Sequence, residues 1–317
     1  MVLTRHNNGN ALVLAAMLII CALLLGIMAV HAPTFYRPNN LINVLVQASM
    51  VGLLAVGMCY VMVGGGIDLS MPSILAFSGI VGAMYMRQTQ DVVLGPIVML
   101  ATGAALGAFN GIAVAYLRMA PFVVTLATMT VVGGVSVWVT GSQSIVGYPT
   151  SFEDVFLAKI AGLPVSVWLF LLGAVIAAVV MARTSFGRSV QAVGFNSKAA
   201  LIGRIPVKRI LLVTYVISGA LAGLTAILLV ARLGAASANL ASDSLLLDII
   251  SACVIGRVSI YGGVGKPLNA ALGAVMVIII SNSMNQLGVS YYASLVIKGV
   301  VIIGFVYLDR VIRRKQA

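Results

Sequence analysis

Ten apolar blocks, each with at most one charged residue, divide the chain, and most of them are long enough to cross a bilayer. They cover residues 11–30, 41–63, 72–86, 92–117, 121–140, 164–182, 210–231, 245–256, 267–287 and 289–308. A transmembrane helix needs about 20 apolar residues, whereas a barrel is built from alternating strands of roughly ten. Because unpaired backbone groups are costly in hydrocarbon, these blocks must fold as helices. The sequence therefore predicts an all-α, polytopic membrane helix bundle.

The overall composition supports this interpretation. Charged residues make up only 8% of the chain and the mean hydropathy is +1.13, whereas about 25% of a soluble domain is charged. The blocks at 72–86 and 245–256 are short for a full span, so we expect broken or re-entrant segments there. We predict one transmembrane domain over residues 1–317, with about ten helices.

The distribution of charge predicts the orientation of the chain. Lys and Arg accumulate at 183–209, which has no acidic residue, and at the C-terminus, and such an excess marks the cytoplasmic side. Glu153 and Asp243 fall in connections that ten spans place outside. Both termini are predicted to be cytoplasmic, and 11–30 to be a retained helix, since no A-x-A-like cleavage site precedes His31. The net charge of +12 then reflects topology and attraction to membrane lipid, and nucleic acid is not an expected partner.

A first interruption of the apolar pattern combines glycines, an acid, hydroxyls and a proline. Adjacent glycines free the backbone and Pro72 removes a donor, so a helix break is predicted. An acid beside a break in a membrane helix is a functional candidate by default. The alternative is that Asp68 only caps the next helix through its N-terminal amides. The break glycines are Gly64, Gly65 and Gly66, and the translocation-pathway candidates are Asp68, Ser70 and Ser73.

A second glycine-rich break follows a short apolar block and has Asp248 just before it. Its glycines are Gly256, Gly262 and Gly263. Gly265 and Lys266 resemble part of a phosphate-binding loop, but Pro267 replaces the Ser or Thr and Ile260 occupies the place of the upstream glycine. The chain is therefore predicted to have no ATP site of its own.

No catalytic or metal-binding constellation is visible in the sequence. His6 and His31 have no acidic neighbour along the chain, and all three cysteines lie inside apolar blocks. We expect neither a metal nor a cofactor, and no enzymatic activity of this chain alone.

Glycines at four-residue spacing recur within two of the spans. Gly103, Gly107 and Gly111 share one helix face, and Gly219 and Gly223 share another. Small residues at this spacing let helix backbones approach closely, so we expect these two spans to be tightly packed.

The basic connection at 183–209 is much longer than a turn. Asn196 is a good N-cap and Gly203 a good C-terminal stop, so 197–202 is predicted to form a short helix outside the bilayer. Such a knob suits docking to another protein. The alternative is an interfacial helix that rests on lipid headgroups.

Three patterns occur in order at 65–70, 187–203 and 247–263. At these residues the sequence resembles the ribose-type permease subunits of bacterial ABC importers for monosaccharides. The resemblance covers about residues 41 to 310, with a weaker match at Lys298-Gly299. It implies a ten-helix subunit that pairs with a second permease, two cytoplasmic ATPases and a periplasmic sugar-binding protein. ATP would be bound by the ATPases.

The resemblance also implies that 183–209 is the ATPase-docking loop. The docking residues it suggests are Gly187, Arg188, Ala192, Gly194, Asn196, Ala199, Ala200 and Gly203. Among these, Ala199, Ala200 and Gly203 are the small residues that we expect to permit the closest approach of the partner.

The sequence departs from the family pattern at three places. Met71-Pro72 stands where Val-Gly is usual, and Arg257 stands where a second glycine is usual. Both changes touch the predicted breaks and therefore bear on pore geometry and substrate preference. Ser197-Lys198 replaces common acidic or proline residues, which bears on the choice of ATPase.

Sparse polar residues inside the spans complete the set of pathway candidates. They are Asn110, Thr125, Thr128, Asn282 and Lys298, which join Asp248 and the first-break residues. The alternative role for most of them is interhelical hydrogen bonding. Two rival functions are a branched-chain amino-acid ABC permease and an ion-coupled secondary transporter. The second rival needs acids within its spans, and here only Asp68 and Asp248 come close.

Overall fold

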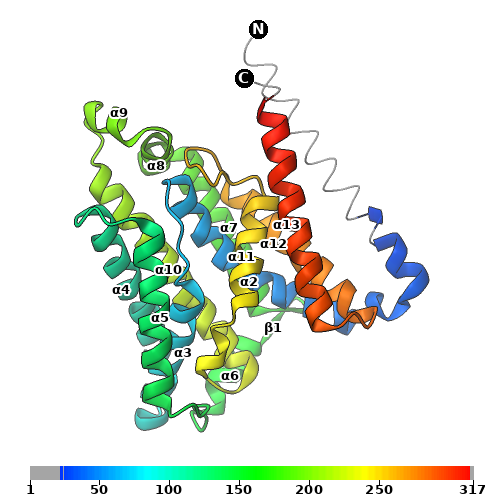
Figure 1. Cartoon of the computed structure of the whole chain (residues 1–317). Helices are drawn as coiled ribbons and strands as arrows, with labels where there is room; N and C mark the ends of the chain where they lie inside the picture. Colours follow the sequence, from blue (N-terminus) through cyan, green and yellow to red (C-terminus); the bar gives the residue numbers. More distant parts are fainter. Residues whose placement is uncertain (1–21, 24, 315–317) are drawn as a thin grey trace.

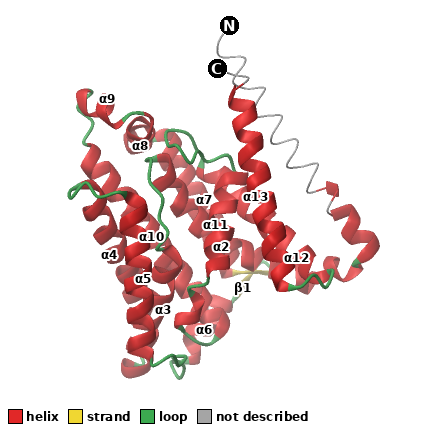
Figure 2. Ribbon diagram, viewed as in Figure 1, coloured by secondary structure: helices red, strands yellow, loops and turns green. Residues whose placement is uncertain are grey.

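The computed structural model describes residues 22–23 and 25–314, and most of them belong to helices (Figures 1 and 2). The long helices are α2 (Pro38–Val63), α3 (Met71–Thr89), α4 (Leu94–Ala115), α5 (Pro121–Thr140), α7 (Val165–Arg183), α10 (Val207–Leu233), α11 (Asp243–Ile255), α12 (Pro267–Gln286) and α13 (Tyr291–Arg314). The shorter elements are η1 (Pro33–Tyr36), α6 (Thr150–Leu157), β1 (Lys159–Ile160), β2 (Leu163–Pro164), α8 (Ser185–Phe195), α9 (Ser197–Ile202) and η2 (Ala238–Leu240). Lys159 of β1 pairs with Pro164 of β2 in an antiparallel register.

The predicted helical membrane bundle is confirmed. Seven segments of the described chain are long and apolar enough to cross a membrane: α2, α4, α5, α7, α10, α12 and residues 238–255, which include α11. The helices α3 and α13 cover the predicted blocks 72–86 and 289–308. The first predicted span, 11–30, lies mostly outside the described residues. The total of about ten spans therefore stays a prediction.

Helix α2 forms the centre of the bundle. It packs against α7, α10, α11 and α12, and nearly all of its residues from Ala48 onward are buried. The side chains of α2 itself are mostly apolar on every face, which is typical of a helix enclosed by other helices. By contrast, α4, α5 and α7 expose rows of large apolar side chains, such as Phe109, Val131 and Leu172. These outward faces are suited to contact with lipid.

The two glycine-rich spans form α4 and α10. Their predicted close packing is confirmed. A Cβ added to Gly103 would lie 2.9 Å from the backbone nitrogen of Gly223 and would overlap the carbonyl oxygen of Gly219. The two helices therefore touch backbone to backbone, as small residues at this spacing allow.

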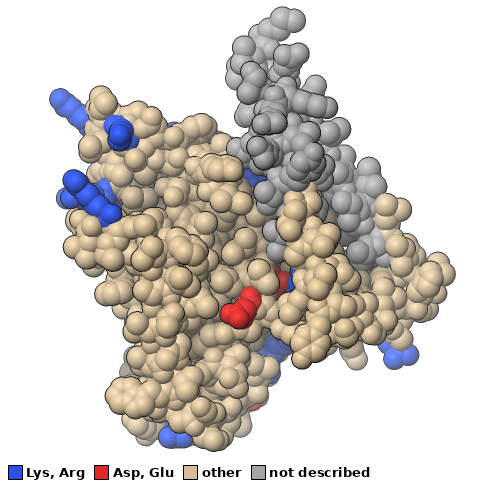
Figure 3. All heavy atoms as spheres, in the orientation of Figure 1, with Lys and Arg blue, Asp and Glu red and all other residues tan. Residues whose placement is uncertain are grey.

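The connections divide between the two ends of the bundle. Helices α8 and α9 lie at one end and α6 at the other, and the C-terminal end of α13 lies toward the α8–α9 end (Figure 1). A backbone bridge between Ile145 and Ala236 joins the two connections that were expected to lie on the outer side. Basic side chains gather at the α8–α9 end in the space-filling view, whereas most of the face between the ends carries no charge (Figure 3).

The predicted docking loop at 183–209 contains more helix than we expected from the sequence. The short helix at 197–202 is confirmed as α9, but α8 was not predicted. The side chain of Thr184 caps α8 by accepting a hydrogen bond from the amide of Gly187, and Val190 and Val193 are buried beneath the helix. The helical spacing of these two valines was the overlooked signal.

Candidate functional site

The carboxylate of Asp68 lies at the centre of a fully buried polar network at the first glycine break. Its Oδ1 accepts hydrogen bonds from the backbone N–H and the hydroxyl of Ser70, at 3.1 and 2.5 Å. Its Oδ2 accepts a hydrogen bond from the hydroxyl of Ser218 on α10, at 2.7 Å. All three residues have an exposed fraction of 0%. Among the residues that the structure describes, no basic side chain pairs with this acid.

The network continues from Ser70 into α4 and α5. The side-chain amide of Asn110 donates to the Ser70 hydroxyl at 2.8 Å, and the hydroxyl of Thr128 donates to the amide oxygen of Asn110 at 2.6 Å. Asp68, Ser70, Asn110 and Thr128 were separate pathway candidates in the sequence. The structure brings these four together and, with Ser218 of α10, connects the first break with three different helices.

The capping alternative for Asp68 accounts for part of this geometry. The carboxylate does accept one backbone N–H, that of Ser70, which is the residue before α3. It accepts none from inside the helix, and its other partners are hydroxyl groups. Asp68 therefore organises contacts between helices in addition to the start of α3.

The two remaining candidates near this break lie beside the network. The hydroxyl of Thr125 on α5 is 3.2 Å from the carbonyl oxygen of Ile67 and 3.0 Å from that of Pro121 in its own helix. Ser73 is buried in the first turn of α3 and faces Gly133 of α5. Thr125 thus holds α5 against the extended segment that precedes α3.

Two residues of α10 at this site were missed in the sequence. Ser218 supplies a donor to Asp68, and Tyr215, one turn earlier, is buried with its hydroxyl against Gly66. Within the described chain that hydroxyl has no hydrogen-bond partner. The available signal was the three-residue spacing of two polar side chains beside the glycines of an apolar span.

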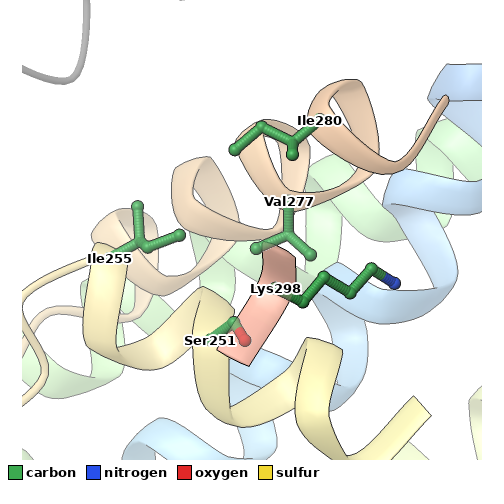
Figure 4. Close-up of a pocket in the computed structure, with 5 residues that line it drawn as sticks. All are labelled: Ser251, Ile255, Val277, Ile280 and Lys298. Carbon is green, nitrogen blue, oxygen red and sulfur yellow. The ribbon is translucent and has the colours of Figure 1, made fainter. Parts of the chain in front are cut away.

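The second acid, Asp248 of α11, forms an ion pair. Its Oδ1 lies 2.8 Å from Nζ of Lys298 on α13, and both side chains are 13% exposed. Lys298, Ser251 of α11 and Val277 of α12 line the same small hollow, of about 10 Å³, and are drawn in Figure 4. Two pathway candidates from different predicted spans are therefore partners of each other.

The candidate Asn282 lies apart from both acids. It exchanges hydrogen bonds with Asn40 of α2, at 3.0 and 3.1 Å, and Gln286 donates to the same Asn40 oxygen. This geometry matches the interhelical alternative, because it joins the start of α2 to the end of α12.

The predicted break glycines end helices, as expected. Helix α2 stops at Val63 with Gly64 as its cap, and α11 stops at Ile255 with Gly256 as its cap. Positive φ angles occur at Gly65 (+88°), Gly262 (+86°) and Gly263 (+77°), a region that favours glycine. Arg257 also has a positive φ of +59°, at the position where the family pattern has glycine.

The docking loop presents a different surface from the one that we expected. Asn196 caps α9 through the amides of Lys198 and Ala199, at 3.0 Å each. Ala200, however, is only 6% exposed and packs into the helix bundle itself. The large apolar side chains that face outward here are Phe195, Leu201 and Ile202, which are 72%, 66% and 84% exposed.

The other predicted docking residues divide between buried and exposed positions. Gly187 is buried against Met181, and Ala192 and Gly194 are partly buried. Arg188, Asn196, Ala199 and Gly203 are exposed. The segment thus combines an inner face that contacts the bundle with an outer face that is open to a partner.

Comparison with known proteins finds relatives along nearly the whole chain. The chain is 38% identical to the ribose import permease protein RbsC of Bacillus subtilis, over 90% of this chain and 88% of that protein. It is 34% identical to the D-allose transport system permease protein AlsC of Escherichia coli, over 93% of this chain and 91% of that protein. It is 32% identical to the L-arabinose ABC transporter permease protein AraH of Azospirillum brasilense, over 91% of this chain and 85% of that protein.

No solved structure matches the chain. A family model described as "Branched-chain amino acid transport system / permease component" matches residues 40–306, which include both glycine breaks and the docking loop. The chain is a multi-pass membrane protein of the inner membrane and belongs to this family of transport permeases.

Proposed function

We propose that this chain is the permease subunit of an ATP-binding-cassette importer that carries a monosaccharide or a related small polyol across the inner membrane. The observation that carries the proposal is the similarity, over about nine-tenths of the chain, to permeases named for ribose, allose and arabinose. Its partners are then a second permease subunit, two cytoplasmic ATPases and a periplasmic sugar-binding protein. Both chain termini are on the cytoplasmic side in this proposal, in keeping with the basic connection and C-terminus.

Sugar fits better than the branched-chain amino acid in the description of the family model. That description names amino acids for the family as a whole, whereas the relatives at 32–38% identity are named for sugars. An ion-coupled transporter is also disfavoured, because these relatives are import permeases and the buried acids here are occupied by protein partners.

The α8–α9 segment is the proposed site of ATPase docking. Leu201 and Ile202 expose apolar side chains in a basic segment at the end of the bundle, and such exposed apolar groups indicate contact with another surface. Since Ala200 is buried in the permease, the contact surface consists of its exposed neighbours. Headgroup binding is the competing outcome for the same side chains.

The Asp68 network is the proposed latch of the translocation pathway in this conformation. Its hydrogen bonds hold the first break against α4, α5 and α10, so a path between these helices stays closed while they persist. ATP binding to the partners shifts the population toward a state in which these bonds are exchanged, provided that the two states differ in affinity for the nucleotide-bound ATPases. Sugar hydroxyls can replace the serine and threonine hydroxyls as partners of the freed groups.

The test of this function uses the complete chain in mild detergent. The wild-type protein is expected to copurify with an ATPase, and its ATP hydrolysis is expected to rise when the binding protein and ribose, allose or arabinose are added. Stimulation by leucine instead of any sugar would identify the branched-chain rival. Transport of sugar without an ATPase would overturn the proposal.

The docking surface is tested by Ile202→Asp. A buried, unpaired charge at a protein interface costs several kcal/mol, so ATPase copurification is expected to fall about tenfold or more. The matched control is Val155→Asp on α6, a residue that is 58% exposed at the opposite end of the bundle, and it should retain the ATPase. If Ile202→Asp keeps the ATPase but loses binding to anionic vesicles, the segment contacts lipid and the docking assignment is wrong.

A further inference from the structure

Four glycines from three distant parts of the sequence meet at the α8–α9 end of the bundle. They are Gly65 of the first break, Gly194 at the end of α8, and Gly262 and Gly263 of the second break, and we call this set the glycine junction. The amide of Gly263 donates a hydrogen bond to the carbonyl oxygen of Val63, the last residue of α2, at 2.8 Å. The two breaks are thus joined directly through their backbones.

The end of α8 is inserted between these two breaks. A Cβ added to Gly194 would lie 2.5 Å from the amide nitrogen of Gly263 and would overlap the carbonyl oxygen of Val63. A Cβ added to Gly262 would lie 2.7 Å from the carbonyl oxygen of Gly194 and 3.0 Å from Cα of Gly65. No side chain fits at these contacts, so the docking segment touches both breaks through backbone atoms.

The physical reason for a glycine at position 194 differs from the reason at the other three positions. Gly65, Gly262 and Gly263 have positive φ angles, so their backbone conformation favours glycine. Gly194 is the next-to-last residue of helix α8 and has no positive φ angle, so alanine could adopt its backbone conformation. Its lack of a side chain therefore serves the contact with Val63 and Gly263 and not the local fold.

The junction lies close along the chain to the polar network. Asp68 follows Gly65 by three positions along the chain, which corresponds to at most about 11 Å of extended chain. Asp68 in turn contacts Ser218 of α10 and, through Ser70, Asn110 of α4. A continuous run of contacts therefore leads from Gly194 through Gly65 to the hydrogen bonds around Asp68.

We propose that the glycine junction transmits the movement of the docking segment to both helix breaks at once, with Gly194 as the positioning residue. This inference rests on the proposed function. Backbone-to-backbone contact suits the role, because no rotamer change at the contact can absorb the movement, and packed interfaces switch between discrete arrangements. The ring of Phe195 supports the contact from outside, since it lies within 2.6 Å of the position of a Cβ on Gly263.

The first test is Gly194→Ala in the full complex with its ATPases and binding protein. ATPase copurification is expected to stay at the wild-type level, because the exposed docking face is unchanged. Sugar uptake is expected to fall at least tenfold, and stimulation of ATP hydrolysis by the binding protein should be lost. The matched control is Gly134→Ala in α5, where an added Cβ has nothing within 4 Å, and it should transport normally.

The outcomes separate the junction from the proposed function. Uptake within twofold of wild type in correctly inserted Gly194→Ala overturns the junction, whereas a wild-type chain that binds no ATPase overturns the function itself. If Gly194→Ala is depleted from the membrane, Val63→Ala decides the matter, since it loosens the junction by removing atoms of a fully buried side chain at the end of α2 and creates no clash. It should lower uptake about threefold or more with ATPase binding retained. Unchanged uptake, or a fall accompanied by loss of the ATPase, overturns the proposal.

Discussion

Each of the two glycine breaks has an acid near it along the chain, but the two acids are held in different ways. At the first break, the carboxylate of Asp68 is fully buried and accepts hydrogen bonds from Ser70 and Ser218, with no cation beside it in the described chain. At the second break, the carboxylate of Asp248 is 13% exposed and paired with the ammonium group of Lys298. One acid is held by dipoles from several helices, and the other by a single opposite charge.

This difference indicates different mechanical roles. An ion pair of low exposure is costly to separate, because each charge is then left without its partner. A network of hydroxyl groups can exchange partners one bond at a time, since each hydroxyl both donates and accepts. We therefore interpret the Asp248–Lys298 pair as a fixed clamp between α11 and α13, and the Asp68 network as the part that rearranges during transport.

The largest expected effect is on stability and comes from breaking the ion pair. Lys298→Ala leaves the Asp248 carboxylate nearly buried and without a counter-charge, so we expect a loss of about 3–5 kcal/mol. The measurement is the free energy of unfolding in a mild detergent. The double variant Asp248→Asn with Lys298→Met should recover most of the loss, because it leaves no unpaired charge. A double variant as unstable as Lys298→Ala would contradict the clamp.

An intermediate effect is expected from Asp68→Asn. The amide keeps the size of the carboxylate but replaces one acceptor oxygen by a donor, so a buried hydroxyl of Ser70 or Ser218 loses its acceptor. The expected loss of stability is about 1–3 kcal/mol, and sugar uptake should fall at least tenfold because the latch is altered. Asp91→Asn is the control, since Asp91 is partly exposed and only accepts from the amides of Val93 and Leu94. Normal uptake in folded Asp68→Asn would mean that the network has a purely structural role.

The smallest effect is expected at the end of the network, from Thr128→Val. This change keeps the shape of the side chain and removes one hydrogen bond, to the amide oxygen of Asn110. The loss of stability should be about 0.5–1.5 kcal/mol. Thr130→Val is the matched control on the same helix, because its exposed hydroxyl bonds only to the carbonyl oxygen of Leu126 in its own helix. Equal effects of the two variants on the unfolding midpoint would show that the network ends at Asn110.

Most of the helices could be predicted from the sequence, because a chain segment in lipid must satisfy its backbone hydrogen bonds internally and therefore folds as a helix. Residues 121–140 were predicted to the residue as α5, and 41–63 and 210–231 to within about three residues of α2 and α10. The α9 helix was found through its cap, Asn196. The helix α8 was missed because its amphipathic pattern lies in a polar connection, where apolar blocks give no signal.

The site residues were identified by type but could not be grouped. Asp68, Asn110 and Thr128 are isolated polar residues in apolar sequence, which marks each as unusual. Nothing along the chain indicates that they bond to one another or that Ser218 joins them. Likewise, Lys298 and Asp248 were each noted, but their pairing depends on how α13 packs against α11.

The sequence by itself determined that this chain is a helical membrane protein, where its helices break and which segment projects from the bundle. Those properties depend on local composition: apolar length, adjacent glycines and a capping side chain. Only the tertiary structure decided that Gly65, Gly194, Gly262 and Gly263 touch, that Ala200 faces inward and Ile202 outward, and that one acid has hydroxyl partners while the other has a lysine. These contacts join segments at least 50 residues apart. They depend on which helix faces pack together, which the pattern along a single helix leaves open.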